Sequence, residues 1–222
     1  MPLCEFKNAC TDPLEGKYIR LQRLNPEQDY EELYDISHGT PEKLAIWNYL
    51  HFPFPYKQPF ESIDLFKQFL VDLNETEDWV TFVVVDKKSN RKIGQTSFLN
   101  IVPSHKRAEI GGVWYTPEFH GTYANTESTL LLLFHLFENF GFRRAEWKLN
   151  ADNIPSGKAA AKLGFTAEGV FRQHMLVNGI NRDTKWYSML DSEWEEKKNA
   201  LFERLGYTDE DKENIFKKNK KL

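Results

Sequence analysis

The stretch "LNADNIPSGKAAAKLGFTAEGVF", residues 149–171, is the most informative part of the chain for the fold. An amide side chain, Asn153, and a hydroxyl, Ser156, stand three residues apart where a short helix over 154–163 is predicted to begin. "LGF" ends that helix after only a few turns. Because a helix this short is rarely stable alone, we expect its first turn to have a binding role.

Length and composition limit the possible classes of protein. The 222 residues are enough for one large domain, or for a domain with an extension. Hydrophobic residues make up 41% and aromatic residues 14%, which is typical of a folded chain. The formal net charge of −4 makes nucleic acid an unlikely partner, and the lysine-rich C-terminal end is interrupted by acidic residues.

The cysteines and the N-terminus predict a location. Cys4 and Cys10 lack a second cysteine pair or a histidine cluster, so we expect thiols in a reducing compartment. The six histidines show no metal-ligand spacing, and no metal is expected. No leader pattern and no run of about 20 apolar residues is present. The prediction is a cytoplasmic protein, with the nucleus possible and no membrane association.

The order of the expected elements predicts a mixed α/β (α+β) fold. A strand–helix–strand unit over 108–150 requires one parallel strand pair inside an otherwise antiparallel sheet. The central helix of that unit begins at Asn125 or Thr126, ends at Gly141 and is apolar on nearly every side, which indicates a buried position. The other expected elements are strands at 17–24, over 79–116 and at 144–150, helices at 25–37 and 60–74, and a hairpin over 166–190 turned at "NG".

A parallel pair can diverge and leave a cleft next to helix N-termini, where ligands bind. The loop "TPEFHGTYANTES" before the central helix offers backbone N–H groups to a phosphate, and Gly121 permits a close approach. The alternative is that the residues of this loop only cap the central helix and bind no phosphate. The aromatic segment 46–60 is either a surface loop packed by its own rings or a wall that faces the substrate.

The run from 108 to 194 resembles the GNAT superfamily of acetyl-coenzyme A-dependent N-acetyltransferases, within it the RimJ/RimL-like branch. The matching pieces are "AEIGGVWYTPEFHGTYANTESTLLLL" and "LNADNIPSGKAAAKLGFTAEGVFRQHMLVNGINRDTKWYSMLDSEW". The N-terminal half agrees only in the order of its elements. The resemblance implies a mostly antiparallel central sheet with one splayed parallel pair and helices on both faces. We expect this domain over 17–194, with an N-terminal extension at 1–16 and a helical, partly disordered basic tail at 195–222.

The resemblance also implies acetyl-CoA as co-substrate, with its pyrophosphate at the N-terminus of the central helix. The loop departs from the family pattern, because Tyr123 stands where a glycine is usual and is expected to strain the loop or narrow the pocket. Lys158 and Lys162 are spaced to reach a coenzyme phosphate, or to form a solvated helix face. The residues expected to bind the coenzyme are Val113, Trp114, Tyr115, His120, Gly121, Thr122, Tyr123, Ala124, Asn125, Thr126, Asn153, Ser156 and Lys158.

Two residues are candidates for catalysis. Strict alternation places Glu109 on one strand face with Gly111 and Val113, where its carboxylate could deprotonate an amine; the alternative is a solvated residue paired with Arg107 or Lys106. The tyrosine that the family uses to protonate the thiolate is replaced by Ala160. We therefore expect the Ser156 hydroxyl to bond the coenzyme sulfur, unless it meets a backbone group of its own helix.

These observations predict an N-acetyltransferase that moves an acetyl group from acetyl-CoA to a primary amine by direct attack with a general base. The acceptor is a protein N-terminus or a small amine, and the protein is a monomer or a homodimer. One alternative is a catalytically inactive module that binds coenzyme A or another nucleotide. Another is an interaction protein that uses the aromatic segment 46–60 and the basic tail.

Overall fold

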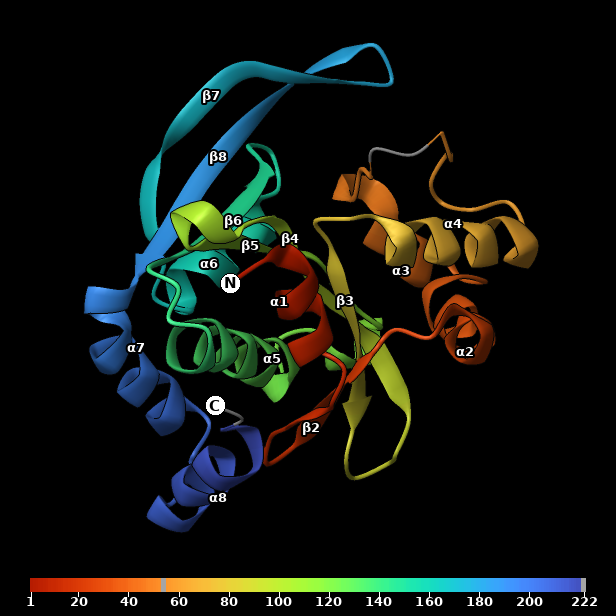
Figure 1. The fold of residues 1–222 in the computed structure, drawn as a ribbon. Helices are drawn as coiled ribbons and strands as arrows, with labels where there is room; N and C mark the ends of the chain where they lie inside the picture. Colours follow the sequence, from red (N-terminus) through yellow and green to blue (C-terminus); the bar gives the residue numbers. More distant parts are fainter. Residues whose placement is uncertain (53–54, 221–222) are drawn as a thin grey trace.

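A computed structural model describes residues 1–52 and 55–220, and its centre is a sheet of eight strands (Figure 1). The strand order is β1-β2-β3-β4-β5-β6-β8-β7, and β5–β6 is the parallel pair among antiparallel neighbours. This confirms the predicted mixed sheet. The strands are β1 (Leu14–Glu15), β2 (Ile19–Arg23), β3 (Val80–Asp86), β4 (Lys92–Val102), β5 (Arg107–Tyr115), β6 (Arg144–Asn150), β7 (Thr166–Val177) and β8 (Ile180–Leu190).

Helices cover both faces of the sheet, as expected (Figure 1). One face carries α2 (Pro26–Ser37), α3 (Pro41–Leu44) and α4 (Ile63–Glu75). The other carries α1 (Leu3–Ala9), α5 (Tyr123–Phe134), α6 (Ile154–Lys162), α7 (Asp191–Arg204) and α8 (Asp209–Asn219). Each face therefore has its own hydrophobic core, which we call the α5 core and the α4 core.

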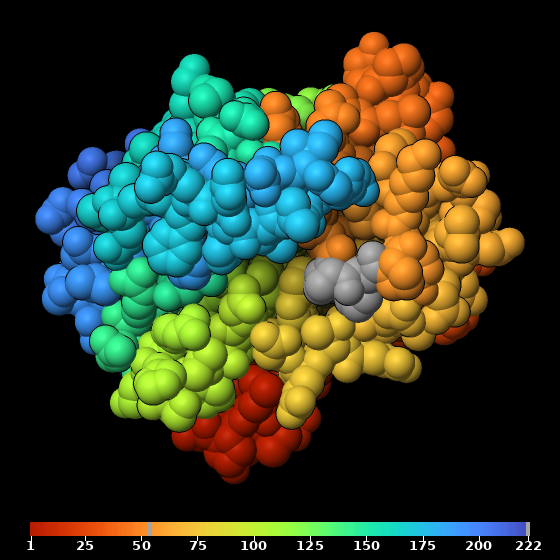
Figure 2. All heavy atoms as spheres, turned by 90° about the horizontal axis from the view of Figure 1, so that it is seen from above, coloured from red at the N-terminus to blue at the C-terminus, as the bar shows by residue number. Residues whose placement is uncertain are grey.

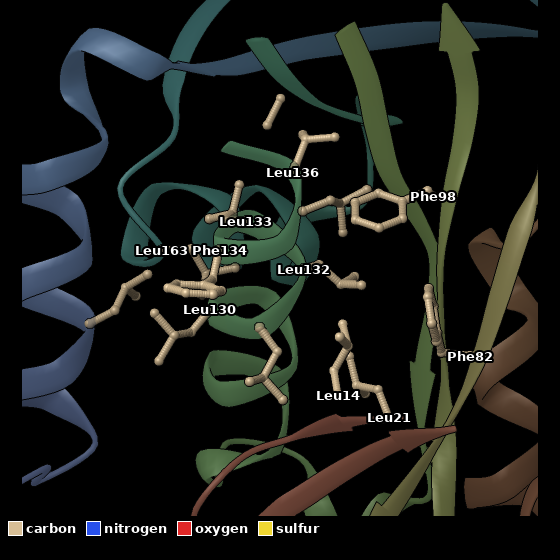
Figure 3. Packing of buried hydrophobic residues seen from close by; sticks show 14 of the residues in the cluster. Leu14, Leu21, Phe82, Phe98, Leu130, Leu132, Leu133, Phe134, Leu136 and Leu163 are labelled. Atoms are coloured by element: carbon tan, nitrogen blue, oxygen red, sulfur yellow. The ribbon is translucent and has the colours of Figure 1, made fainter. Parts of the chain in front are cut away.

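The α5 core is centred on α5, whose leucines face the sheet, α7 and α6 (Figure 3). Leu130, Leu132 and Phe134 are at most 1% exposed, and they pack in the same cluster as Phe82 and Phe98 of the sheet. A fully buried side chain of this size contributes roughly 1.5–3 kcal/mol to folding. The predicted central position of this helix is confirmed.

The ends of α5 differ from the prediction. Thr122, not Asn125 or Thr126, is the N-cap: its backbone is extended and its side chain accepts a hydrogen bond from the backbone N–H of Ala124. The helix therefore begins one turn earlier. At its C-terminus it continues as a π-helix over His135–Asn139 before Gly141 turns the chain with a φ of +59°.

The terminal segments pack on the same core as the central domain. Phe6 of α1 is fully buried in the α5 core. Asn219 at the end of α8 accepts a hydrogen bond from the Glu15 backbone N–H at 2.7 Å and donates to the Glu15 carbonyl at 2.9 Å. The boundaries drawn at 1–16 and 195–222 stay a prediction, and the last two residues of the predicted basic tail lie outside the described residues.

Candidate active site

The parallel pair β5–β6 is short and ends at two carboxylates. Its register joins Arg107 to Arg144, Ala108 to Ala145 and Glu109 to Glu146, and no further pair of these strands is bonded in the described residues. The strands separate beyond this point. Glu109 and Glu146 thus lie side by side where the sheet opens.

The Glu109 side chain is buried but only half saturated with hydrogen bonds. Its Oε2 atom accepts from Asn100 Nδ2 at 2.7 Å and pairs with Lys148 Nζ at 2.9 Å. Its Oε1 atom accepts no hydrogen bond from the described residues. Burial raises the pKa of Glu109, although Lys148 and Asn100 oppose the shift. The alternative of a solvated Glu109 is wrong, because the residue is 5% exposed and its cation is Lys148.

The neighbouring Glu146 forms ion pairs with three cations, one of which, Lys148, also pairs with Glu109. It pairs with Lys148 at 3.0 Å, Arg144 at 3.0 Å and Arg107 at 3.3 Å. Burial works to raise the pKa of Glu146, but hydrogen bonds from Arg144 and Lys148 outweigh it and the pKa is lowered. Glu146 therefore stays ionised and holds Lys148 in place beside Glu109.

A bulge follows Glu109 in β5, at the glycine pair Gly111-Gly112. Ser97 of β4 faces Gly111, but the next paired residue, Gln95, faces Trp114, and Gly112 has a φ of +59°. The extra residue reverses the alternation, so the expectation that Val113 shares the face of Glu109 is wrong. Val113 instead packs against the α5 core.

The bulge also changes what residues 113–115 offer a ligand. The Trp114 ring belongs to the α4 core, is 4% exposed and lies 5.7 Å from the Trp47 ring. Tyr115 is 6% exposed in the α5 core. Because these side chains are packed inside, coenzyme contacts from this segment would have to come from the backbone.

A cavity of about 700 Å³ opens in front of Glu109. Its floor includes Glu109, Gly111 and Lys148, and its walls come from segments 49–58 and 174–186. In Figure 2 the β7–β8 hairpin crosses this face of the molecule toward the orange segment around residue 50. Of the predicted catalytic and coenzyme-binding residues, Glu109 is the one that lines this cavity within the described chain.

The aromatic segment 46–60 is packed by its own rings and also contributes residues to the cavity wall. Trp47 and Phe60 are buried in the α4 core, 5.2 Å apart between ring centroids. His51, Phe52 and Tyr56 line the cavity. Pro53 and Phe54 lie outside the described residues. The segment thus forms a wall of the cavity that is anchored by its own rings.

The loop before α5 fits a phosphate group through its backbone. Gly121 has a φ of +74°, and a Cβ atom there would have nothing within 4 Å, so the approach is open. The first backbone N–H groups of a helix have no acceptor within it and attract anions. Thr122 bonds Phe119, and His120 Nε2 lies 2.9 Å from the Tyr115 carbonyl oxygen, so these polar side chains are already engaged.

The remaining residues of this loop are also hydrogen-bonded or buried within the fold. Tyr123 donates to Asp86 at 2.6 Å and has no positive φ, so the strain expected at this position is absent. Asn125 lies within 3.5 Å of the Tyr115 hydroxyl. Ala124 and Thr126 are buried. The geometry favours recognition by main-chain groups.

The Asn-x-x-Ser turn has the predicted cap and an unexpected partner. Asn153 accepts a hydrogen bond from the Ser156 backbone N–H at 3.1 Å, which confirms the cap. Ser156 Oγ accepts from the Trp147 indole at 3.0 Å, so its partner among the described residues is an indole and not a backbone group of its own helix. The hydroxyl keeps its own proton to donate. Lys158 and Lys162 are exposed.

Sequence reasoning missed Lys148, Asn100, Arg182 and Trp186. Lys148 could have been found, because it follows Glu146 by two residues and therefore shares its strand face. Asn100 has a left-handed backbone with a φ of +49° that no local pattern indicates. Arg182 and Trp186 line the cavity because the β7–β8 hairpin leans over it.

Comparisons with known proteins agree with this arrangement. Residues 19–166 match the family described as "Acetyltransferase (GNAT) domain". The crystal structure of a GCN5-related N-acetyltransferase from Brucella melitensis is similar at a TM-score of 0.80 and 34% identity, covering 86% of this chain and 84% of that chain. The "Putative ribosomal N-acetyltransferase YdaF" of Bacillus subtilis (strain 168) is 25% identical over 82% of this chain and 97% of its own length.

A third comparison shows the same fold. The structure of Mycobacterium smegmatis RimJ in complex with CoA-disulfide shares the fold at a TM-score of 0.73 and 18% identity, covering 89% of this chain and 96% of that chain. The fold and the open parallel pair define an acyltransferase of the GNAT class. The chain belongs to the GNAT acetyltransferases and is similar to RimJ/RimL-like members.

Two kinds of feature are absent from the described residues. No helix in 1–52 or 55–220 is long and apolar enough to cross a bilayer. In the same part of the chain, no group of three or more His, Cys, Asp or Glu side chains is placed to hold a metal ion.

Proposed function

We propose that this protein transfers the acetyl group of acetyl-CoA to a primary amine, and that the amine is the N-terminus of a protein, with ribosomal proteins as the first candidates. The observation that supports this most is the Glu109 carboxylate, buried at the cavity floor with Oε1 unbonded by the described residues. The name of the Bacillus subtilis relative supports the choice of acceptor. A ribosomal acceptor would agree with the expected cytoplasmic location.

The residues on the α5 side would hold the coenzyme. The N-terminus of α5 with Gly121 offers its backbone N–H groups to the pyrophosphate. The opening between β5 and β6, which begins after Glu109, would give the coenzyme a path toward that residue. Asn153 and Ser156 begin α6, the helix that follows β6, and would lie beside the pantetheine arm.

The chemistry then needs a base and a partner for the leaving group. An N-terminal amine with a pKa near 8 is mostly protonated at neutral pH, and Glu109 Oε1 would accept that proton. The nitrogen then forms a bond to the carbonyl carbon while the carbon–sulfur bond breaks. The Ser156 hydroxyl would donate a hydrogen bond to the departing thiolate, held in place by the Trp147 indole.

Thiol release in the presence of acetyl-CoA and peptides that copy ribosomal-protein N-termini tests this function. Release that depends on the peptide, with the acetyl group on its α-amine by mass spectrometry, is the expected result. Tight coenzyme binding without turnover on peptides or small amines would instead favour the inactive binding module. Transfer to small amines alone would overturn the protein acceptor.

A further inference from the structure

The wall of the cavity opposite segment 49–58 carries nitrogen donors without acceptors. Arg182 Nε and Trp186 Nε1 are buried, and neither has a hydrogen-bond partner in the part of the chain that the structure describes. Both residues line the cavity. Gln58 Nε2, on the facing wall, is also buried and unpartnered. A buried unpaired donor is destabilising, and an acceptor on a ligand would remove that cost.

The two donors on β8 belong to one row. Arg182, Thr184 and Trp186 alternate along the strand and therefore share one face. Thr184 Oγ1 lies 3.0 Å from His174 Nδ1, so the middle position is already satisfied. The donors of Arg182 and Trp186, at the two ends of the row, are therefore available to bind a ligand.

Arg182 also brings a charge that forms no ion pair with a carboxylate of the described residues. The carboxylates at the floor, Glu109 and Glu146, pair with Lys148, Arg107 and Arg144, not with Arg182. Arg182 is close enough to Glu109 to feel its field, and burial lowers the pKa of its guanidinium. An arginine stays protonated at neutral pH, so the cavity holds a positive charge beside the general base.

The row has a direction relative to the chemistry. Lys148 Nζ lies 4.2 Å from the Trp186 ring centre and 2.9 Å from Glu109, which marks Trp186 as the catalytic end. Arg182 is four residues further along the strand, toward the hairpin tip. An extended peptide advances about 3.3 Å per residue, so side chains one to three residues from an amine at Glu109 would pass along this row.

We propose that the acceptor carries a carboxylate close to its amine, and that Arg182 binds this carboxylate while Glu109 receives the amine. This inference rests on the proposed function and narrows its substrate class to N-termini with Asp or Glu within the first few residues. Carboxylate recognition by a planar guanidinium is bidentate and specific. Trp186 and Gln58 supply further donors along the same path.

Matched peptides test the proposal. Pairs that differ only by Asp against Asn at position two or three are compared in kcat/KM with acetyl-CoA saturating. The acidic member is expected to be favoured about 10- to 100-fold, chiefly through KM, because the amide leaves the guanidinium unpaired. Free aspartate and asparagine form a second arm, which separates a small amino acid from a peptide as the source of the carboxylate.

Two variants identify the residue responsible. R182Q should bring both members of each pair to equal rates, and R182K should restore part of the preference, because a lysine keeps the charge but not the fork. R172Q is the matched control: Arg172 is an exposed arginine on the other strand of the hairpin and is not among the cavity-lining residues. It should keep the preference. The KM for acetyl-CoA should change in neither glutamine variant.

Three results would overturn the inference: equal rates for acidic and amide peptides in the wild type, a preference that survives in R182Q, or one that is lost equally in R172Q. The same peptide pairs are also measured by calorimetry without acetyl-CoA. Acid-selective binding that R182Q abolishes supports the inference even where no acetyl transfer occurs. The failure of the proposed function and the failure of this inference are thereby distinguished.

Discussion

Two buried glutamates on opposite faces of the sheet have opposite surroundings. Glu127 of α5 accepts hydrogen bonds from the backbone N–H groups of Lys17, Tyr18 and Ile19 and from the Tyr207 hydroxyl. Both of its oxygens are used. Glu109 accepts on one oxygen from the described residues, and its side chain lines a cavity.

Burial raises the pKa of both carboxyl groups, so burial alone does not distinguish a structural from a catalytic residue. The difference lies in the lone pairs that the fold leaves unused. A carboxylate whose two oxygens both accept hydrogen bonds from the protein stabilises the structure around it. A carboxylate with one oxygen unbonded can accept a proton from a ligand. The following predictions separate the two roles.

The largest expected effect is that of Glu109→Gln on turnover. The amide keeps the size of the side chain but cannot accept a proton, so kcat should fall roughly 100- to 10,000-fold. The affinity for acetyl-CoA should stay nearly unchanged. Steady-state kinetics with an N-terminal peptide measures both, and wild-type turnover at pH 7 would rule out the base.

The pH profile of the same pair of enzymes sharpens this assignment. Because the carboxylate is the active form, wild-type kcat/KM should rise with pH through the raised pKa of Glu109. The variant should lack this limb, and its deficit should shrink toward pH 9.5 as free amine becomes available. A deficit that is constant across the range would instead assign Glu109 to positioning the acceptor.

Glu127→Gln should show the converse behaviour. The new amide would turn an N–H₂ group toward backbone donors, so we expect the free energy of unfolding to fall by about 2–4 kcal/mol. At about 2–4 °C per kcal/mol for a chain of this size, Tm should fall by roughly 4–16 °C. Thermal unfolding and kinetics below Tm check this.

Glu213→Gln is the control for that variant. Glu213 is 69% exposed and pairs with Lys217 on the surface of α8, so its loss should change stability by less than about 0.5 kcal/mol. Equal destabilisation by both changes would mean that the bonds around Glu127 do not hold the structure. A lower kcat of the Glu127→Gln variant, measured below its Tm, would show that Glu127 has more than a structural role.

Acetyl-CoA should stabilise the folded chain by about 2.7 kcal/mol at a concentration 100 times its dissociation constant. Tm should rise by roughly 5–11 °C for a protein of this length. Differential scanning fluorimetry with acetyl-CoA, and with ATP as a control, measures this. The absence of a shift at millimolar coenzyme would remove the proposed donor.

The smallest effects concern the loop before α5. Gly121→Val forces a branched residue into a positive φ and obstructs the open approach, so KM for acetyl-CoA should rise more than about tenfold. Thr122→Ala loses the cap to the Ala124 backbone N–H, worth about 1 kcal/mol, and should raise KM only slightly. Equal, small effects would place the pyrophosphate elsewhere.

Local patterns predicted the sheet, the parallel pair and the buried α5, because each leaves a mark in hydrophobic spacing. They also indicated Glu109, which lines the cavity and whose role as base stays a prediction, and Asn153, which caps α6. They failed where one residue shifts a register: the bulge at Gly112 turns Val113 to the α5 core, contrary to strict alternation. They also failed for Arg182, whose relevance depends on a hairpin leaning over a cavity and not on its neighbours in the chain.

The bonds between Asn219 and Glu15 join residues at the two ends of the chain, 204 positions apart. Such a contact carries the full entropy of closing a very long loop and belongs to the slow, non-local part of folding. During synthesis β1 leaves the ribosome long before α8 does. This edge of the sheet therefore stays uncovered in the nascent chain until α8 has been made. A ribosome stalled before α8 would hold an acetyltransferase domain whose β1 edge is still open.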